Sequence, residues 1–269
     1  MKGGSTMNTL NSLFILAIAV SPLLAAEPNA PDVNTVVNNA NIAAYYQGDD
    51  GKAQVRMVIT NKGGQTRERE FIILRKDIAD GGDQNYFVYF QKPADVRKMV
   101  YLVQKHTGGK DDDRWLYLPG LDLVKRIAAS DKRTSFVGSD FLYEDVSGRG
   151  VEADIHTLES VTDKYYIIKN VPKEPDTVEF SYYTIAVDKN NFLPIEMTFY
   201  DKNAKLYRTI ESVTVEDIEG FPTVTKSIVK DLNQGSRTEM EFSNIKYNIG
   251  VGDIFTERYL RRPPREVVR

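Results

Sequence analysis

Residues 114–146, RWLYLPGLDLVKRIAASDKRTSFVGSDFLYEDV, form the stretch that says most about the fold of this chain. The stretch opens with an aromatic and apolar run, Trp115–Leu118, which predicts a β-strand. Pro119 and Gly120 end the strand, because proline lacks the N–H that a sheet needs and glycine permits a tight turn. An aromatic strand therefore stands at the start of the stretch.

The end of the same stretch predicts a short helical segment beside this strand. Ser139 or Asp140 could accept the free N–H groups of a helix's first turn. Phe141 and Tyr143 would then lie on a capped segment next to aromatic side chains. Gly138, just before the cap, could act as a hinge.

Three patterns within the stretch resemble those of a known family. They are WLYLP at 115–119, KRI at 125–127 and SFVGSDFLYED at 135–145, and they are similar to patterns of the LolA-like outer-membrane lipoprotein-sorting proteins of Gram-negative bacteria. A coarse β pattern extends the resemblance from about Asn41 to Leu260. The resemblance implies a mainly β fold, in which a curved antiparallel sheet forms an incomplete half-barrel, closed by short helices, that holds acyl chains in an apolar cavity.

Composition excludes several classes of protein. The chain has 269 residues, a formal net charge of −3 and a sequence pI near 5.6, so it lacks the basic footprint of a nucleic-acid-binding protein. It contains no cysteine, which removes disulfides, thiol nucleophiles and a lipid-modified N-terminal cysteine together. The 15 tyrosines and 12 phenylalanines suit sheets and apolar pockets.

Residues 1–26 resemble a secretory signal peptide. Lys2 precedes an apolar run at 13–20, and Leu24-Ala25-Ala26 provides small residues before a cleavage point. The run is far shorter than the roughly 20 residues that a membrane-spanning helix needs. We therefore expect an exported, soluble, periplasmic protein.

The remaining pattern predicts one helix followed by a meander of strands. An amphipathic helix should begin after Asp32 and end before Gly48. Apolar runs between turn signals predict strands at 53–60, 69–75, 86–91, 99–105, 114–118, 177–187, 194–200, 205–216, 223–231 and 236–247. No repeat or change of composition marks a second domain, so we expect a single domain at 27–260 and a basic, solvated tail at 261–269.

The two halves of the meander differ in their apolar pattern. Runs 71–74, 86–90 and 99–103 are apolar on both faces, which indicates that both sides of the sheet are covered there. Near Met197 and Met240 the strands alternate, so one side should face solvent.

The motifs of an enzyme are missing. His106 and His156 are the two histidines, and neither belongs to a known catalytic motif. Asp111–Asp113 could attract a cation, but a solvated hairpin turn is the simpler interpretation. Glu144 and Asp145 near Asp140 could act on a glycan, but helix capping explains Asp140 more simply, and the other two are interpreted as ordinary surface acids. We expect no catalytic residue, no metal and no cofactor.

The sequence therefore predicts a binding protein. The hypothesis is a monomeric periplasmic carrier that shields acyl chains of lipoproteins or envelope lipids and passes them toward the outer membrane, with an inner-membrane transporter and transient membrane contact as partners. The predicted lid comprises Gly138, Ser139, Asp140 and the residues up to Val146; the latching arginine of the sorting proteins finds no match by motif. The predicted cavity residues are Met57, Met99, Tyr101, Trp115, Tyr117, Phe136, Phe141 and Tyr143. A lipid-sensing regulator, similar to those that bind anti-sigma factors, and a glycan or ester hydrolase are the alternatives.

Overall fold

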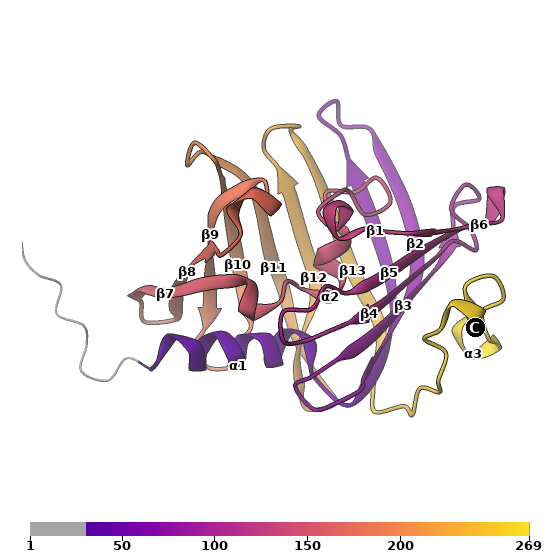
Figure 1. Ribbon diagram of the computed structural model, residues 1–269, viewed down its shortest axis with the longest axis horizontal. Helices are drawn as coiled ribbons and strands as arrows, with labels where there is room; N and C mark the ends of the chain where they lie inside the picture. Colours follow the sequence, from indigo (N-terminus) through magenta and orange to yellow (C-terminus); the bar gives the residue numbers. More distant parts are fainter. Residues whose placement is uncertain (1–30, 269) are drawn as a thin grey trace, which may run out of the picture. The chain divides into compact units, whose positions relative to one another are not determined.

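One antiparallel sheet dominates the computed structural model, which describes residues 31–268; the predicted signal peptide lies outside this range. In the described residues the sheet has 13 strands, in the order β6-β5-β4-β3-β2-β1-β13-β12-β11-β10-β9-β8-β7 (Figure 1). The strands are β1 (Asp50–Thr60), β2 (Thr66–Asp77), β3 (Gln84–Lys92), β4 (Val100–Lys105), β5 (Asp113–Leu118), β6 (Leu123–Arg126), β7 (Asp154–Val161), β8 (Tyr165–Pro172), β9 (Phe180–Asp188), β10 (Pro194–Asp201), β11 (Leu206–Ile218), β12 (Phe221–Asp231) and β13 (Ser236–Tyr247).

Helices in the described residues are few and short. The α-helices are α1 (Val33–Tyr45), α2 (Tyr143–Ser147) and α3 (Arg265–Val268). The 3-10 turns are η1 (Pro119–Leu121), η2 (Ala129–Asp131), η3 (Val151–Ala153), η4 (Pro175–Thr177) and η5 (Glu257–Tyr259). None of the helices among residues 31–268 is both long and apolar enough to cross a membrane.

Two meanders, β1 to β6 and β7 to β13, make up the sheet and join where β1 pairs with β13. Strands β6 and β7 follow each other in the chain but lie at opposite edges of the sheet. The connection between them, residues 127–153, is called the lid segment below. The predicted curved antiparallel sheet is confirmed. The two edge strands do not pair with each other, so the sheet is not a closed barrel. Its expected closure by short helices is not confirmed.

The lid segment packs on one side of the sheet, which we call the inner face. Val55, Met57 and Phe71 lie on this face and are at most 3% exposed. Phe136, Phe141 and Tyr143 of the lid segment join the inner-face residues of the first meander in one apolar cluster.

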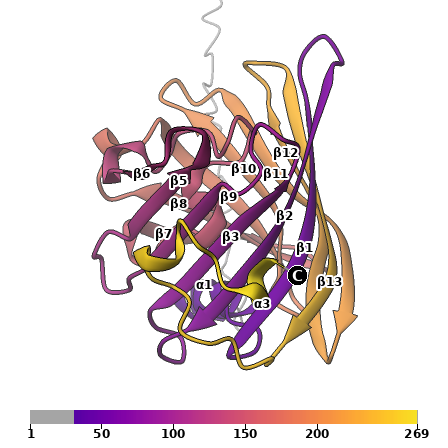
Figure 2. The ribbon, with the colours of Figure 1, turned by 90° about the vertical axis from the view of Figure 1, so that its right-hand side faces the viewer.

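The opposite, outer face of the first meander is covered by the end of the chain. Ile72, Phe87 and Leu102 alternate with inner-face residues and are fully buried. They pack against Val251, Ile254, Phe255, Leu260 and Val267, in the yellow segment that lies across these strands in Figure 2. Both faces are thus covered, which confirms the prediction made from the doubly apolar strands.

The outer face of the second meander is solvated, also as predicted. Its cross-strand neighbours form charge pairs, such as Lys230 with Glu211 at 2.6 Å and Lys226 with Glu241 at 3.0 Å. Exposed pairs of this kind contribute little stability, but they keep the face polar.

Helix α1 forms where the sequence predicts it. The Asp32 carboxylate accepts a hydrogen bond from the Thr35 N–H at 3.1 Å, which caps the first turn. Val36 and Ala40 are buried against Ile168 and Val187 of β8 and β9. The helix therefore covers the inner face of β8 and β9, near the β7 edge of the sheet (Figure 1).

Two parts of the fold differ from the sequence-based expectation. Strands β6, β7 and β8 were not predicted. Strand β6 is only four residues long and β7 is polar at most positions, whereas β8 starts with the apolar run Tyr165–Ile168 and was overlooked. The residues after Leu260 were expected to form a solvated tail, yet Val267 is fully buried and Arg261 pairs with Asp122 at 3.0 Å. This end of the chain is part of the packed structure.

Candidate functional site

A cavity of about 370 Å³ lies on the inner face. Its walls come from the end of α1, the lid segment and strands of both meanders, with β1, β12 and β13 at the centre. Most lining side chains are apolar, among them Phe71, Val88, Phe141, Met197, Ile210 and Phe242. Small-molecule pockets occupy roughly 300–1,000 Å³, so this cavity is large enough for a ligand.

Phe136 anchors the lid segment over the cavity. Its ring centroid lies 5.5 Å from that of Tyr101, 5.8 Å from that of Phe90 and 5.6 Å from that of Tyr143. The Tyr101 hydroxyl also donates to the backbone oxygen of Tyr143 at 3.1 Å. These aromatic contacts fix the lid segment on the first meander.

The turn at the tip of the lid segment is held by hydrogen bonds among its own residues and by hydrogen bonds to β13. The Ser139 hydroxyl donates to the Phe136 oxygen at 2.7 Å, and the Phe136 N–H donates to the Phe141 oxygen at the same distance. The Asp140 carboxylate accepts hydrogen bonds from the hydroxyls of Ser236 and Thr238, at 2.5 and 2.7 Å. The tip is thereby tied to the start of β13.

The predicted cap of the short helix needs correction. Neither Ser139 nor Asp140 caps α2, because both use their side chains inside the tip and on β13. Instead, the Asp145 carboxylate accepts the Leu142 N–H at 2.6 Å. The helix begins at Tyr143, later than the pattern suggests.

Arg208 on β11 links the lid segment to the second meander. One guanidinium nitrogen donates to the Asp140 oxygen at 3.2 Å and also to the Asp145 carboxylate. The side chain is only 4% exposed, and it lies 5.2 Å from the centroid of the Phe199 ring. Sequence reasoning assigned no arginine to this role, since Arg208 lies far from the lid segment in the chain.

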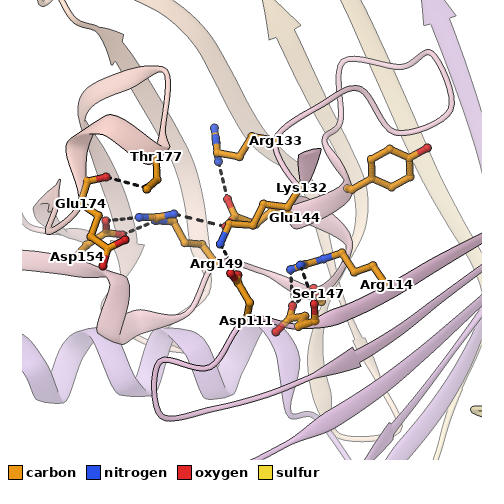
Figure 3. Close-up of polar contacts among 12 residues, drawn as sticks. Asp111, Arg114, Lys132, Arg133, Glu144, Ser147, Arg149, Asp154, Glu174 and Thr177 are labelled. Atoms are coloured by element: carbon orange, nitrogen blue, oxygen red, sulfur yellow. Dashed lines mark hydrogen bonds and ion pairs between the residues drawn. The ribbon is translucent and has the colours of Figure 1, made fainter. Parts of the chain in front are cut away.

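Glu144 is the centre of a buried charge network (Figure 3). Its carboxylate, 5% exposed, lies 2.6 Å from Arg133 and 3.4 Å from Arg149. Each arginine has a further carboxylate, Glu179 for Arg133 and Asp154 for Arg149. Arg133, Glu144 and Arg149 line the cavity together, and this charged part of its wall is called the polar end below. Gln47, Lys52 and Arg75 add further polar groups to the wall.

The ion pairs of this network perturb the ionisation of their members. Burial alone would raise the pKa of Glu179, but the hydrogen bond and the charge of Arg133 outweigh it and lower that pKa to about 2. The Tyr207 hydroxyl adds a hydrogen bond to Glu179 at 2.8 Å. The carboxylate is therefore stabilised in its charged form.

The far end of the lid segment meets α1. A Cβ on Gly148 would lie 2.5 Å from the Tyr45 ring, and its φ of +77° is one that glycine adopts easily. The buried Lys105 amine donates to the Ser147 oxygen at 2.7 Å and lies 5.0 Å from the Tyr45 ring centroid. Tyr45 and Gly148 both line the cavity, so this junction forms part of its wall.

The predicted cavity residues divide into two groups. Met57, Met99, Tyr101, Phe136, Phe141 and Tyr143 all lie in the inner-face cluster, and Phe136 and Phe141 reach the cavity itself. Trp115 and Tyr117 lie on the outer face, against the end of the chain. The alternation of β5 explains this difference, because it directs Leu116 inward and its neighbours outward.

The second meander supplies cavity residues that the sequence-based interpretation did not select. Met197, Ile210, Met240 and Phe242 all line the cavity. Their alternation with polar residues marks an apolar face. That signal cannot distinguish a filled core from a hollow one.

The acidic and histidine residues singled out in the sequence have structural partners. Asp112 pairs with Arg114 at 2.5 Å and is mostly buried, so the predicted solvated turn is wrong at this position, whereas Asp111 is exposed. His106 lies between Asp83 and Asp113, 3.1 Å from each. Within residues 31–268 no group of three or more histidine, aspartate or glutamate residues could hold a metal ion.

Comparisons with known proteins agree with this architecture. A family model described as "Uncharacterized protein" matches residues 82–262. The structure of a DUF1329 family protein from Desulfovibrio piger is similar, with 30% identity and a TM-score of 0.77 over 85% of this chain and 97% of that one. A domain assigned to outer membrane lipoprotein sorting, from Vibrio parahaemolyticus, has 24% identity and a TM-score of 0.75 over the same shares.

A third structure, a LolA superfamily protein from Nitrosomonas europaea, has 19% identity and a TM-score of 0.64 over 86% of this chain and all of that one. At this identity the likeness concerns the fold alone. The comparison with curated proteins gives no match. The chain belongs to the DUF1329 family and has the fold of the LolA-like lipoprotein-sorting proteins.

Proposed function

We propose that this protein binds the acyl chain of a lipid or lipoprotein in the inner-face cavity and carries it through the periplasm toward the outer membrane. The observation that carries the proposal is the apolar cavity of about 370 Å³ beneath the lid segment. The LolA-like fold and the likeness to a lipoprotein-sorting domain support the same assignment.

The size of the cavity suits part of one hydrocarbon chain. A methylene group takes about the volume of a water molecule, roughly 30 Å³. The cavity volume of about 370 Å³ therefore holds on the order of a dozen methylene groups. Each buried methylene contributes roughly 0.8 kcal/mol. Binding therefore needs no covalent step, even after the entropy lost on association is subtracted.

The polar end of the cavity favours an amphiphile over a pure hydrocarbon. Arg133, Glu144 and Arg149 line this end, and their charges would be poorly solvated by a methyl terminus. A ligand that points its polar group toward them satisfies both parts of the wall.

Release of the ligand then requires movement of the lid segment. Arg208 and the Glu144 network tie α2 to the second meander, while the aromatic contacts of Phe136 tie the tip to the first. Gly138, with a φ of +76°, is the proposed hinge. Opening exchanges ion pairs for hydration and involves no chemical reaction.

A matched pair of tryptophan substitutions on β11 tests the proposal. Ile210 lines the cavity, whereas Val213 on the same strand is 50% exposed. Ile210→Trp should fill the cavity and reduce binding of a fluorescent fatty acid at least about tenfold, the loss expected when a few methylene groups are displaced. Val213→Trp should bind as the wild type does.

Circular dichroism and urea unfolding establish that both variants are folded. Equal affinity of the two folded variants for the fatty acid would contradict the proposal, since a ligand in the cavity has to compete with the new indole. If Ile210→Trp does not fold, Met197→Trp on β10 provides the same test from the next strand.

A further inference from the structure

The turn between β5 and β6 carries exposed leucines beside a group of cations. Leu121 is 73% exposed and Leu123 is 46% exposed. Lys125 is exposed on the same hairpin. Single exposed leucines are common on protein surfaces, so the surroundings of this turn decide whether it has a role.

The end of the chain brings arginines to this turn. Arg261 pairs with Asp122 at 3.0 Å, and its guanidinium lies 5.9 Å from the centroid of the Tyr117 ring. Arg258 and Arg262 are exposed on either side of Arg261 in the chain. The patch, defined as Leu121, Leu123, Lys125, Arg258, Arg261 and Arg262, thus combines two segments far apart in sequence.

The turn is held in one conformation. Asp122 has a left-handed φ of +45°, and its carboxylate accepts hydrogen bonds from Tyr117 and Arg261. The Asp122 N–H donates to the Pro119 oxygen at 3.2 Å. Leu121 is therefore presented to solvent by a turn that three contacts fix.

The charge of the patch is opposite to that of the whole chain. The patch has four cations, and its two segments also carry two exposed acids, Asp122 and Glu257, so their sum is +4 −2 = +2, whereas the chain carries a formal net charge of −3. Exposed leucines on a turn that an arginine contacts match the boundary between anionic headgroups and acyl chains in a bilayer.

We propose that this patch docks the protein on the surface of an anionic lipid bilayer, with Leu121 inserted among the headgroups. The assignment concerns a surface distinct from the inner-face cavity. The β5–β6 turn lies at the same end of the sheet as the start of β13, where Asp140 holds the tip of the lid segment. Docking there brings the tip close to the membrane.

Vesicle flotation with the purified full chain tests this surface. The protein should float with vesicles of phosphatidylcholine and phosphatidylglycerol in equal amounts, and much less with phosphatidylcholine alone. The double variant Arg258→Glu and Arg262→Glu should reduce the fraction bound at least about tenfold, because each cation near an anionic surface contributes about fivefold. Leu121→Ser should also weaken binding, and added salt should release the wild type.

Control variants change exposed lysines and an exposed apolar residue that lie outside the patch. Lys164→Glu with Lys205→Glu reverses two exposed charges, and Ile42→Ser removes a side chain that is 50% exposed on α1. Both should float as the wild type does. Ile210→Trp should also float normally, which separates docking at the patch from capture of a lipid in the cavity.

Equal binding to neutral and anionic vesicles, or patch variants that float like the wild type, would overturn the proposal. A change of oligomeric state in the patch variants, measured by analytical ultracentrifugation without vesicles, would assign the patch to contact between two copies of the chain instead.

Discussion

Glu144→Gln is the substitution that most directly probes how the lid segment is held. The side chain keeps its size, but the network loses the one carboxylate that bridges Arg133 and Arg149. Removing one partner of a buried ion pair costs roughly 3–5 kcal/mol when the other charge is left unpaired. Both arginines keep a second carboxylate here, so the loss should fall to about 2 kcal/mol, close to one hydrogen bond to a charged group.

For a domain of this size a loss of about 2 kcal/mol lowers the midpoint of thermal unfolding by roughly 4–8 °C. The same loss, if confined to opening of the lid segment, speeds release of a bound fatty acid by up to about 30-fold. Differential scanning calorimetry measures the first effect, and stopped-flow fluorescence with a labelled fatty acid measures the second.

Glu68→Gln is the matched control, because Glu68 forms an exposed ion pair with Arg56 at 2.6 Å on the outer face. Exposed pairs contribute little, so its midpoint and release rate should stay near those of the wild type. Should Glu144→Gln behave like Glu68→Gln in both assays, the ion pairs of Glu144 with Arg133 and Arg149 would contribute nothing to how α2 is held.

Three further outcomes follow from the packing and ionisation of named groups. Leu260→Ala, at a fully buried position in the outer-face cluster, should cost roughly 2–5 kcal/mol in urea unfolding, and an unchanged midpoint would contradict the packing of this segment on the sheet. The folded-state pKa of Glu179 is about 2, below the ordinary pKa of a glutamate. The charged carboxylate therefore stabilises the fold above that ordinary pKa, and this stabilisation is lost as the pH falls from there toward 2. Glu179→Gln should abolish this part of the pH dependence of the urea midpoint. Burial disfavours protonated His106, but hydrogen bonds to Asp113 and Asp83 outweigh it and raise the pKa of His106. The protonated ring therefore stabilises the fold fully below the ordinary pKa of histidine, and this stabilisation is lost as the pH rises through the raised pKa. A folded His106→Gln variant whose stability has the same pH profile as the wild type would refute this.

Much of the architecture could be predicted from short-range patterns. The doubly apolar runs at 71–74 and 86–90 required cover on both faces, and the structure provides it with the lid segment and the end of the chain. The identity of the outer cover could not be predicted. Val251 to Val267 contain scattered apolar residues without a helical or strand period, so the sequence does not show what they cover. Residues up to Leu260 were assigned to the domain without a role, and only the residues after Leu260 were predicted to be a solvated tail.

The candidate site was predictable only in part, because a sequence pattern does not show which strands of the second meander lie next to the lid segment. Phe136 and Phe141 could be selected because they flank the lid tip in the chain. Trp115 and Tyr117 were selected for their aromatic character, although strand alternation places Leu116 inside and these two outside. Arg208, Met240 and Ile210 come from the second meander and meet the lid segment only after β1 pairs with β13.

Native mass spectrometry of the full chain, purified under gentle conditions from the cells that express it, tests most directly whether the inner-face cavity holds an acyl chain. We expect a species heavier than the polypeptide by the mass of one amphiphile, present in the wild type and in Val213→Trp and absent from folded Ile210→Trp. A wild-type spectrum with only the bare polypeptide, together with no uptake of added fatty acid, would contradict it.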